Sequence, residues 1–371
     1  MIRSPCIAIA TWMLLFGLSA CQPKPIPMTE QEAERVQQLT AEMTPHCLGR
    51  HVVDVPKAFV LNSQSAAKVD DVTVSVTPLG RADFDLALAA RRVELERTML
   101  SGKARNIPHL RATIPLPGSQ IGAVFDRTKS PSSSDRMVRT LELIAWREGF
   151  RIDARISARD TTFPEDANDS IAKQLQTNLQ ERLFVLLGVF ERTRGLAKGE
   201  MPAETGLCIA NGFVRGPATD QERAQMAFHL KGSPDVYFNF FSQTEVRDKT
   251  TMLERSAAIE REMRQSGTTT VRKGVRKINA FSYEEWLMRG PTPDRVAGTM
   301  FTLQANETER DPAKPVVEFK LFNGFRIPAP PSTPEESAQM KELTKASLTE
   351  AEALGVWDVV SATIRPREVA P

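Results

Sequence analysis

The order of strand and helix patterns occurs twice along this chain, and that repeat constrains the fold more than any other feature. In each half, extended runs come first, and a helix, further extended runs and a closing helix follow. The run 150–159 shows the strand pattern clearly, because Phe150, Ile152 and Ala154 alternate with charged residues. We therefore expect an α+β chain of two similar tandem domains, each built from an antiparallel-rich sheet with packed helices.

Breaks in the periodicity place the domain boundary near 199–205, where Gly, Pro and Ala interrupt the pattern. We expect an N-terminal domain over 31–203 and a C-terminal domain over 204–371. The first should end in a helix over 171–190, whose apolar residues share one face. The second should contain a helix over 252–264 and a closing helix with a capping box from Ser347 to Glu350 and a stop at Pro366.

Residues 1–20 have the organisation of a signal peptide of the lipoprotein type. Arg3 precedes an apolar run over 7–18 that is too short to cross a hydrocarbon core of about 30 Å as a helix. The sequence Leu18-Ser19-Ala20-Cys21 resembles the lipobox of bacterial lipoproteins, in which the chain is cut before a cysteine that carries the lipid. We therefore expect lipidation at Cys21. The alternative is an ordinary signal peptide followed by a chance cysteine.

Residues 21–30 are then expected to form a lipidated tether. Several acyl chains hold a protein at a bilayer durably, because each buried methylene contributes about 0.8 kcal/mol. Gln22 rather than Asp follows the cysteine, and by resemblance to such lipoproteins it indicates the outer membrane. No other stretch approaches eighteen consecutive apolar residues. We expect a periplasmic protein that meets the membrane through its lipid anchor alone.

The charge pattern excludes one class of partner. The chain has 48 Lys and Arg residues against 46 Asp and Glu residues, with a formal net charge of +2. Acidic and basic residues are interspersed, and no block of five or more Lys or Arg occurs. Such a surface offers no basic patch for a polyanion, so we expect no nucleic-acid partner.

The cysteines predict one long-range covalent link. Cys6 leaves with the signal peptide and Cys21 carries lipid, so Cys47 and Cys208 remain. An oxidising periplasm favours a disulfide between them, and the alternative is two unpaired buried thiols. The bond would close a loop of about 160 residues, which is worth roughly 5 kcal/mol in the chain-entropy model. It would tie the two halves together, with their sheets side by side.

The common catalytic signatures are missing. The sequence has no G-x-S-x-G, H-E-x-x-H, G-x-x-x-x-G-K or C-x-x-C motif. It has four histidines, and His46 and His51 flank Cys47. Instead of a metal or thiol site, we expect these two to be surface residues at strand edges. His229 falls on the polar face of its strand and is expected to be solvated, and His109 starts a strand without an acidic partner nearby in the sequence.

The densest pair of carboxylates lies beside aromatic residues in "YEEW", where Glu284 and Glu285 are adjacent. An acid–base or sugar-binding role for this pair competes with a structural role in a strand or a partner contact, and the structural role is favoured. The sequence therefore predicts no catalytic residue, no metal site and no cofactor.

Six segments together resemble a known family. They are "CLGRHVVDVP", "WREGFRIDARI", "GLCIANGFVRG", "GSPDVYFNFFSQT", "FSYEEWLMRG" and "SLTEAEALGVWDVVSATIRPR". In this order they are similar to the two-domain immunity proteins that protect bacteria against lipase effectors of the type VI secretion system. The resemblance covers roughly 45–367, and the C-terminal "ALGVWDVVSATIRPR" contributes most to it.

The resemblance implies a periplasmic, non-enzymatic protein of two similar α+β domains. Such a protein clamps a cognate phospholipase, holds its lid or substrate entrance closed, and so spares the producing cell. The family diverges at its binding surface, so the partner-binding residues stay unknown here. The alternatives are a lipid-anchored periplasmic enzyme with an unrecognised site and a lipoprotein that serves envelope assembly.

Overall fold

The protein is described by a computed structural model over residues 27–62, 65, 67–101, 107–132, 137–162, 174–245, 247–279, 281–326 and 343–368. The expected signal peptide, Cys21 and most of the expected tether lie outside these residues. Within them, no helix is long and apolar enough to cross a membrane.

The first half begins with helix α1 (Glu30–Thr40) and the hairpin of β1 (Met43–Leu48) and β2 (His51–Pro56). Its strands, helices and closing strand then follow in the predicted order. They are β3 (Phe59–Leu61), β4 (Ala67–Val69), β5 (Val72–Pro78), α2 (Arg81–Arg97), β6 (Leu110–Pro115), β7 (Ile121–Thr128), β8 (Val138–Arg147), β9 (Phe150–Arg159), α3 (Leu179–Arg192) and β10 (Thr193–Gly195).

The second half repeats this order, starting with the hairpin of β11 (Gly206–Ile209) and β12 (Gly212–Arg215). Like the first half, it has a central helix, four long strands and a closing helix. The elements are β13 (Glu222–Leu230), β14 (Ser233–Gln243), α4 (Ser256–Ser266), β15 (Thr269–Ile278), β16 (Phe281–Pro291), β17 (Ala297–Ala305), β18 (Val316–Asn323), α6 (Glu350–Ser361) and β19 (Arg365–Pro366).

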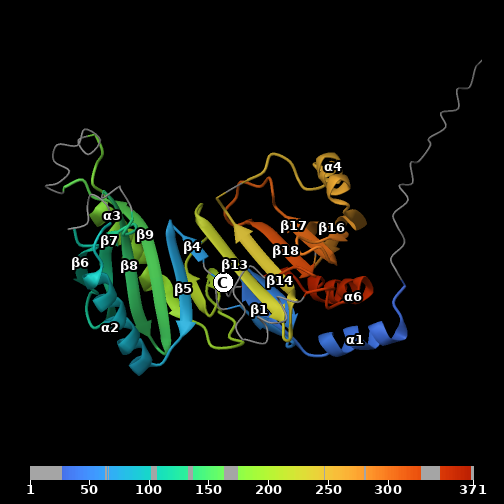
Figure 1. Ribbon diagram of the computed structural model, residues 1–371, viewed down its shortest axis with the longest axis horizontal. Helices are drawn as coiled ribbons and strands as arrows, with labels where there is room; N and C mark the ends of the chain where they lie inside the picture. The colour runs from blue at the N-terminus through green and yellow to red at the C-terminus, as the bar shows by residue number, and fades with distance from the viewer. Residues whose placement is uncertain are drawn as a thin grey trace, which may run out of the picture.

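A single sheet of 13 strands runs through both halves, in place of two sheets side by side. Its order is β15-β16-β17-β18-β14-β13-β4-β5-β9-β8-β7-β6, and β3 pairs with β13. The order reads the same from either end when each strand is replaced by its counterpart in the other half. The halves join where β4 and β13 pair in an antiparallel manner (Figure 1). This pairing removes two edge strands that would otherwise expose unpaired backbone groups.

The two hairpins are exchanged between the halves. Hairpin β1–β2 packs on the core of the second half, where Leu48, Val53 and Val55 join the cluster that contains Phe238 and Trp357. Strand β19 extends this hairpin by pairing with β2. Hairpin β11–β12 packs in the same way on the first half and pairs with β10. Its buried residues in that cluster are Leu207, Ile209 and Val214, which share it with Val74, Ile152 and Leu186.

The disulfide lies where the exchanged hairpins meet. Cys47 and Cys208 form the bond that the sequence predicts, and their Cα atoms are 5.7 Å apart. Beside it, the Gly49 N–H donates to the Cys208 carbonyl at 3.0 Å and the Cys208 N–H donates to the Gly49 carbonyl at 2.8 Å. The bond therefore joins counterpart strands of the two halves.

Helix α1 packs on α6. The Arg35 guanidinium pairs with the Glu352 carboxylate at 3.2 Å, and Val36 is buried. A Cβ added at Gly355 would lie 3.0 Å from Val36 and 2.8 Å from Met28, so a side chain there would push α1 away. The glycine thus permits the close approach of the two helices.

Three helices start later than the sequence predicts. Helix α4 starts at Ser256 instead of near residue 252. The capping box of α6 is formed by Thr349 and Glu352 instead of Ser347 and Glu350. Ser347 is held by Asp235, which accepts from both its N–H and its hydroxyl, so it stays in the preceding turn. Helix α3 starts at Leu179, and the earlier part of the predicted helix lies partly outside the described residues.

Loss of the disulfide should lower stability strongly. Because the bond closes a loop between residues 161 positions apart, Cys47→Ala combined with Cys208→Ala should lower the free energy of unfolding by up to about 5 kcal/mol in urea titrations. Reducing agent should destabilise the natural protein similarly and leave the double variant unchanged. The disulfide would be contradicted if the oxidised natural protein, the reduced natural protein and the double variant all had the same free energy of unfolding.

Candidate partner-binding surface

The histidines are more buried than the sequence predicts. His51 and His229 are buried instead of solvated, and His46 is half-buried. The ring of His46 meets Phe228 edge-on at 4.8 Å between centroids. In the sheet, His229 lies opposite Tyr237 of β14 on one side and opposite Val60 of the short strand β3 on the other. These prediction errors share one cause, since the sequence shows which face of a strand is polar but not what packs on that face.

The environments of His46, His51 and His109 disfavour the charged form of these side chains. Burial lowers the pKa of His51 to about 4, and burial is also the main cause that lowers the pKa of His46 and of His109. His109 lies at the start of β6, as expected, with Nδ1 2.6 Å from the Thr128 hydroxyl. Among the described residues, no cluster of three or more His, Cys, Asp or Glu could hold a metal ion.

Glu284 and Glu285 do not form a catalytic pair. They are neighbours on strand β16, so their side chains point to opposite faces of the sheet. Glu284 accepts from the Leu253 N–H at 2.6 Å. Glu285 is buried and accepts from Arg272 and from the Trp357 indole at 2.9 Å. Both carboxylates therefore serve the architecture.

The pKa of Glu285 fits this structural role. Burial by itself would raise the pKa, but hydrogen bonds from Arg272 and Trp357 and the nearby charges of Arg272 and Arg276 hold it below the usual value. The carboxylate is thus kept ionised and fully engaged, which is the opposite of what a general acid needs.

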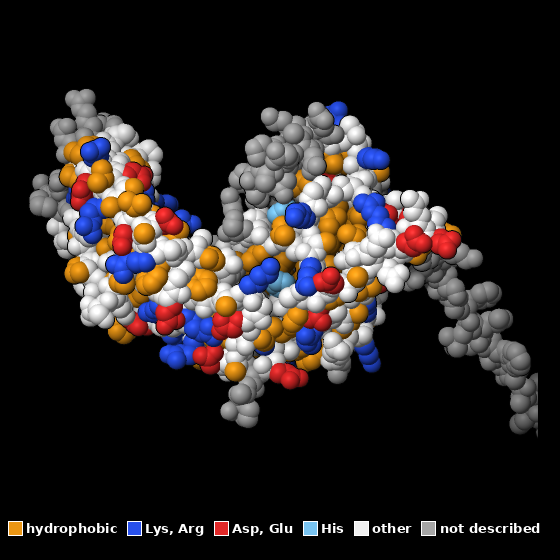
Figure 2. All heavy atoms as spheres, turned by 90° about the horizontal axis from the view of Figure 1, so that it is seen from below, with side chains coloured by type: hydrophobic (Ala, Val, Ile, Leu, Met, Phe, Trp, Pro, Cys, Tyr) orange, Lys and Arg blue, Asp and Glu red, His pale blue; other side chains and the backbone are white. Residues whose placement is uncertain are grey.

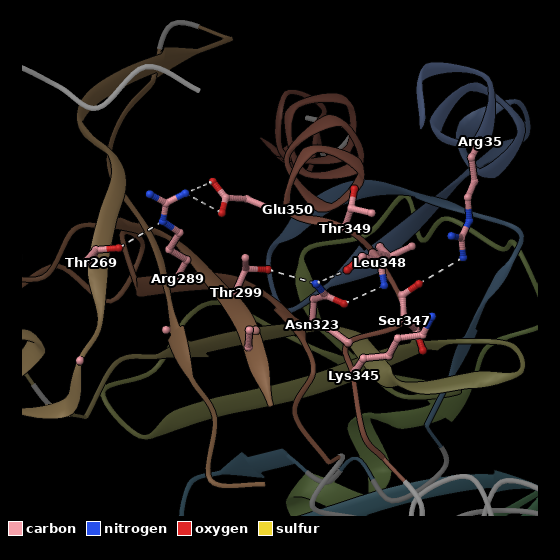
Figure 3. Close-up of a pocket in the computed structure, with 15 residues that line it drawn as sticks. Arg35, Thr269, Arg289, Thr299, Asn323, Lys345, Ser347, Leu348, Thr349 and Glu350 are labelled. Carbon is pink, nitrogen blue, oxygen red and sulfur yellow. Dashed lines mark hydrogen bonds and ion pairs between the residues drawn. The ribbon is translucent and has the colours of Figure 1, made fainter. Parts of the chain in front are cut away.

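A pocket of about 570 Å³ opens between α1, the start of α6 and strands β16 to β18 (Figure 3). Arg289 pairs there with both oxygens of Glu350, at 3.1 and 3.0 Å. Asn323 donates to the Leu348 carbonyl and accepts from the Leu348 N–H. The lining residues include no histidine or cysteine, and the Glu350 carboxylate is already paired.

The middle of the large sheet offers a broad surface. Its strands bury one row of side chains against the exchanged hairpins. The alternate row is half-buried or exposed, except at the pair His229 and Tyr237, where it is buried. Helix α2 packs over β7 and β8, and α4 packs on β16, so both helices flank this row. Figure 1 looks onto β9, β5, β13 and β14 with no helix in front of them. We call this row the central sheet face; it comprises Lys68, Thr73, Ser75, Arg155, Ser157, Arg223, Gln225, Asn239 and Phe241.

The central sheet face is continuous across the junction of the halves. Lys68 of β4 lies opposite Arg223 of β13, and like charges in such a pair repel. Glu245 removes the repulsion, because its carboxylate binds Lys68 at 2.6 Å and Arg223 at 3.3 Å. The hydrogen bond from Lys68 to Glu245 is the main cause that raises the pKa of Lys68. One acidic side chain thus holds two basic residues of different halves together.

The surface of the molecule is hollowed between the halves. Figure 2 shows the halves as two lobes with a notch between them, and acidic and basic side chains are interspersed over both lobes. The alternation of polar residues in β5, β9 and β13 indicates solvent-facing rows already in the sequence. It does not indicate that these rows join into one surface.

These features define a class: a two-domain α+β protein whose halves share one large sheet and one exposed face, and whose described residues include no cluster of three or more His, Cys, Asp or Glu that could hold a metal ion. The chain belongs to the family of Tle cognate immunity protein 4. The N-terminal domain of that family matches residues 44–193, and its C-terminal domain matches residues 200–369. The resemblance seen in the sequence is thereby confirmed.

Solved structures share the fold. The apo immunity protein TplEi of the type VI secretion system from Pseudomonas aeruginosa is 18% identical with a TM-score of 0.63, and the match covers 88% of this chain and 98% of that chain. A chain in the crystal structure of the Tle4–Tli4 complex is 17% identical with a TM-score of 0.65, covering 89% and 99%. TplEi complexed with "L" peptide is 20% identical with a TM-score of 0.56. No curated protein matches the chain in sequence.

Buried, neutral His51 should make the fold sensitive to acid. Its pKa is about 4 in the folded chain and 6.5 without the fold, so the unfolded state binds the proton first as the pH falls. Stability should therefore drop between pH 6.5 and pH 4, by about 3 kcal/mol from this residue alone. His51→Phe removes the titrating imidazole. Between pH 6.5 and pH 4, the free energy of unfolding of this variant in urea should therefore fall less than that of the natural protein. Parallel curves for the two proteins would contradict the prediction.

Proposed function

We propose that this protein binds a cognate lipase effector of the type VI secretion system and inhibits it sterically, so that the producing cell is protected. The carrying observation is that both domains of the immunity family match the chain and that the central sheet face crosses from one domain to the other. One of the solved structures that share this fold is that of the Tle4–Tli4 complex. No enzymatic step is needed for protection by this mechanism.

Steric inhibition requires a large and rigid surface. A stable complex buries about 800 Å² on each partner, and flexibility between two halves of an interface would weaken binding. Here the halves are joined by the β4–β13 pairing, the exchanged hairpins and the Cys47–Cys208 bond. These contacts support a surface that is already shaped before the effector arrives.

Inhibition should be stoichiometric. We expect a neighbouring gene to encode an α/β-hydrolase with a G-x-S-x-G motif, and titration of that lipase with this protein should bring activity to its floor near one molecule per enzyme. The two proteins should also co-purify. Inactivation by far less than one equivalent would favour the alternative of an enzyme, and a lack of any complex would favour an envelope-assembly role.

The central sheet face should carry the contact. Arg155→Glu combined with Gln225→Glu places a negative charge in this face in each half. It should weaken binding to the lipase at least tenfold in calorimetric titrations, because unpaired charges buried in an interface are costly. Lys57→Glu makes the same charge reversal as Arg155→Glu but in an exposed turn outside the face, so it serves as the control and should leave affinity within about threefold. Equal effects of both variants would exclude this face.

The proposed location is the periplasm, with a lipid anchor at the outer membrane. The support is the lipobox-like sequence that ends in Cys21 and the Gln that follows it. Cys21→Ser should remove labelling by a palmitate analogue and should move the protein from the membrane fraction. Equal labelling of the natural and altered proteins would contradict the anchor without affecting the binding proposal.

A further inference from the structure

A row of basic side chains crosses the junction of the halves on the central sheet face. In the pairing register, Arg155 of β9 lies opposite Thr73 of β5, and Thr73 in turn lies opposite Lys68 of β4. Lys68 lies opposite Arg223 of β13. Neighbouring strands are about 4.8 Å apart, so the backbones of these three basic residues lie within about 15 Å of one another. We call Arg155, Lys68 and Arg223 the basic row.

Carboxylates of the protein neutralise this row only in part. Lys68 binds Glu245 at 2.6 Å and Asp71 at 3.0 Å. Arg223 shares the first of these carboxylates at 3.3 Å, and Arg182 of α3 shares the second at 3.4 Å. Two carboxylates thus serve three cations at the junction.

Arg155 adds a further positive charge to the row, and its side chain is exposed. Glu142 lies opposite it on β8, but that carboxylate is bound by two other arginines. Asp153 lies two residues before it on the same face of the strand and is bound by Arg151 at 2.6 Å. The basic row therefore carries a net positive charge.

Two contacts position Arg223 while it stays accessible. Its guanidinium lies 5.8 Å from the centroid of the Phe241 ring and donates to Glu245 at 3.3 Å. The Arg223 side chain is nevertheless 45% exposed. A guanidinium has five N–H donors, and within the described residues one of them is bound. The other donors can bind a carboxylate of a partner.

We infer that the basic row receives an acidic patch of the lipase effector, in which Asp or Glu carboxylates pair with Arg155 and Arg223. The inference rests on the proposed function, and it assigns a charge to the lipase surface that covers the central sheet face. Arginine is enriched at the energetic centres of protein interfaces, and complementary charge speeds association. Because the row extends over both halves, the acidic patch spans their junction.

Two other occupants fit the basic row less well. A second copy that stacked its own central sheet face on this one would place one basic row against the other, and like charges repel. A nucleic acid needs a longer run of cations, whereas Glu245 and Asp71 lie among the cations here. A protein surface with a few carboxylates matches the row in both size and charge.

Binding kinetics at several salt concentrations test the inference, with the neighbouring lipase, its nucleophilic serine replaced by alanine, as the partner. The row variant, Arg155→Ala combined with Arg223→Ala, should slow association about tenfold at low salt. At high salt the difference should shrink to about threefold or less, because salt screens the charges that steer association. The row variant should unfold at the same urea midpoint as the natural protein, since both side chains are exposed.

The matched control removes the same charge from exposed sites outside the central sheet face. Arg215 lies on hairpin strand β12, which packs on the opposite side of the sheet, and Lys57 lies in an exposed turn. Arg215→Ala combined with Lys57→Ala should leave the association rate within about twofold of that of the natural protein, because rate effects depend on where the charge lies. A similar loss in the control and the row variant would show a general charge effect and contradict the inference.

A zero-length cross-link identifies the partner group directly. Arg155→Lys keeps the charge and introduces an amine into the basic row, which a carbodiimide joins to a carboxylate in contact with it. Mass spectrometry of the digested complex should recover the introduced lysine joined to an Asp or Glu of the lipase. Lys57, which is exposed outside the face, should give no peptide joined to the lipase.

The outcomes that would overturn the inference are distinguishable. If the row variant and the natural protein associate equally at low salt, the acidic patch is wrong while the proposed function stands. If the natural protein does not bind the lipase at all, both fail. If the row variant differs from the natural protein in the sedimentation of the free chain, the row contacts a second copy. If only the natural protein binds duplex DNA, the row serves a nucleic acid.

Discussion

Each half of this molecule completes its hydrophobic core with a hairpin from the other half, and the rest of the architecture depends on that exchange. Leu48, Val53 and Val55 of the first hairpin are fully or almost fully buried in the second half. Burial of one such side chain is worth roughly 1.5–3 kcal/mol, so withdrawing the hairpin would cost several kcal/mol from these three residues alone. The same loss would occur in the other half. Packing of the two cores thus already requires the halves to lie together, and the large sheet and the disulfide add further links between them.

This rigidity suits a protein that binds a partner through a preformed surface. The buried charged residues are used for internal pairing, as with Arg139, which is fully buried between Asp126 and Asp160 at 2.8 and 3.4 Å. Burial is the main cause that raises the pKa of Asp126, and a group in this position has no access to a substrate. Other charged side chains, such as Arg155 and Arg223, lie exposed on the outer face of the sheet, where they can contact a protein.

Local patterns predicted the elements well, and their limits are physical. Alternation and helical spacing depend on neighbouring residues, so the order of strands and helices, the two similar domains and the Cys47–Cys208 link could be read from the sequence. The exchange of hairpins could not, because periodicity identifies a buried face without identifying what buries it. The burial of His229 and the later start of α6 were missed for related reasons. Both depend on residues far away in the sequence: strand β3 pairs beside His229, and Asp235 holds the turn before α6. The central sheet face combines rows of residues from strands that are far apart in the sequence. The sequence therefore indicated the polar row of each strand, but it did not indicate that these rows form one surface.

The exchanged hairpins also bear on how such a gene can change over generations. A recombination event near residue 200 would join the first hairpin of one parent to a second-half core from another, and the reverse mismatch would arise in the other core. Both mismatches would leave cavities or overpacking, each of which costs typically 1–5 kcal/mol. Proteins of this architecture are therefore poorly suited to acquiring a new partner by shuffling whole domains. New specificity is more accessible through point changes on the exposed faces, which leave both cores matched.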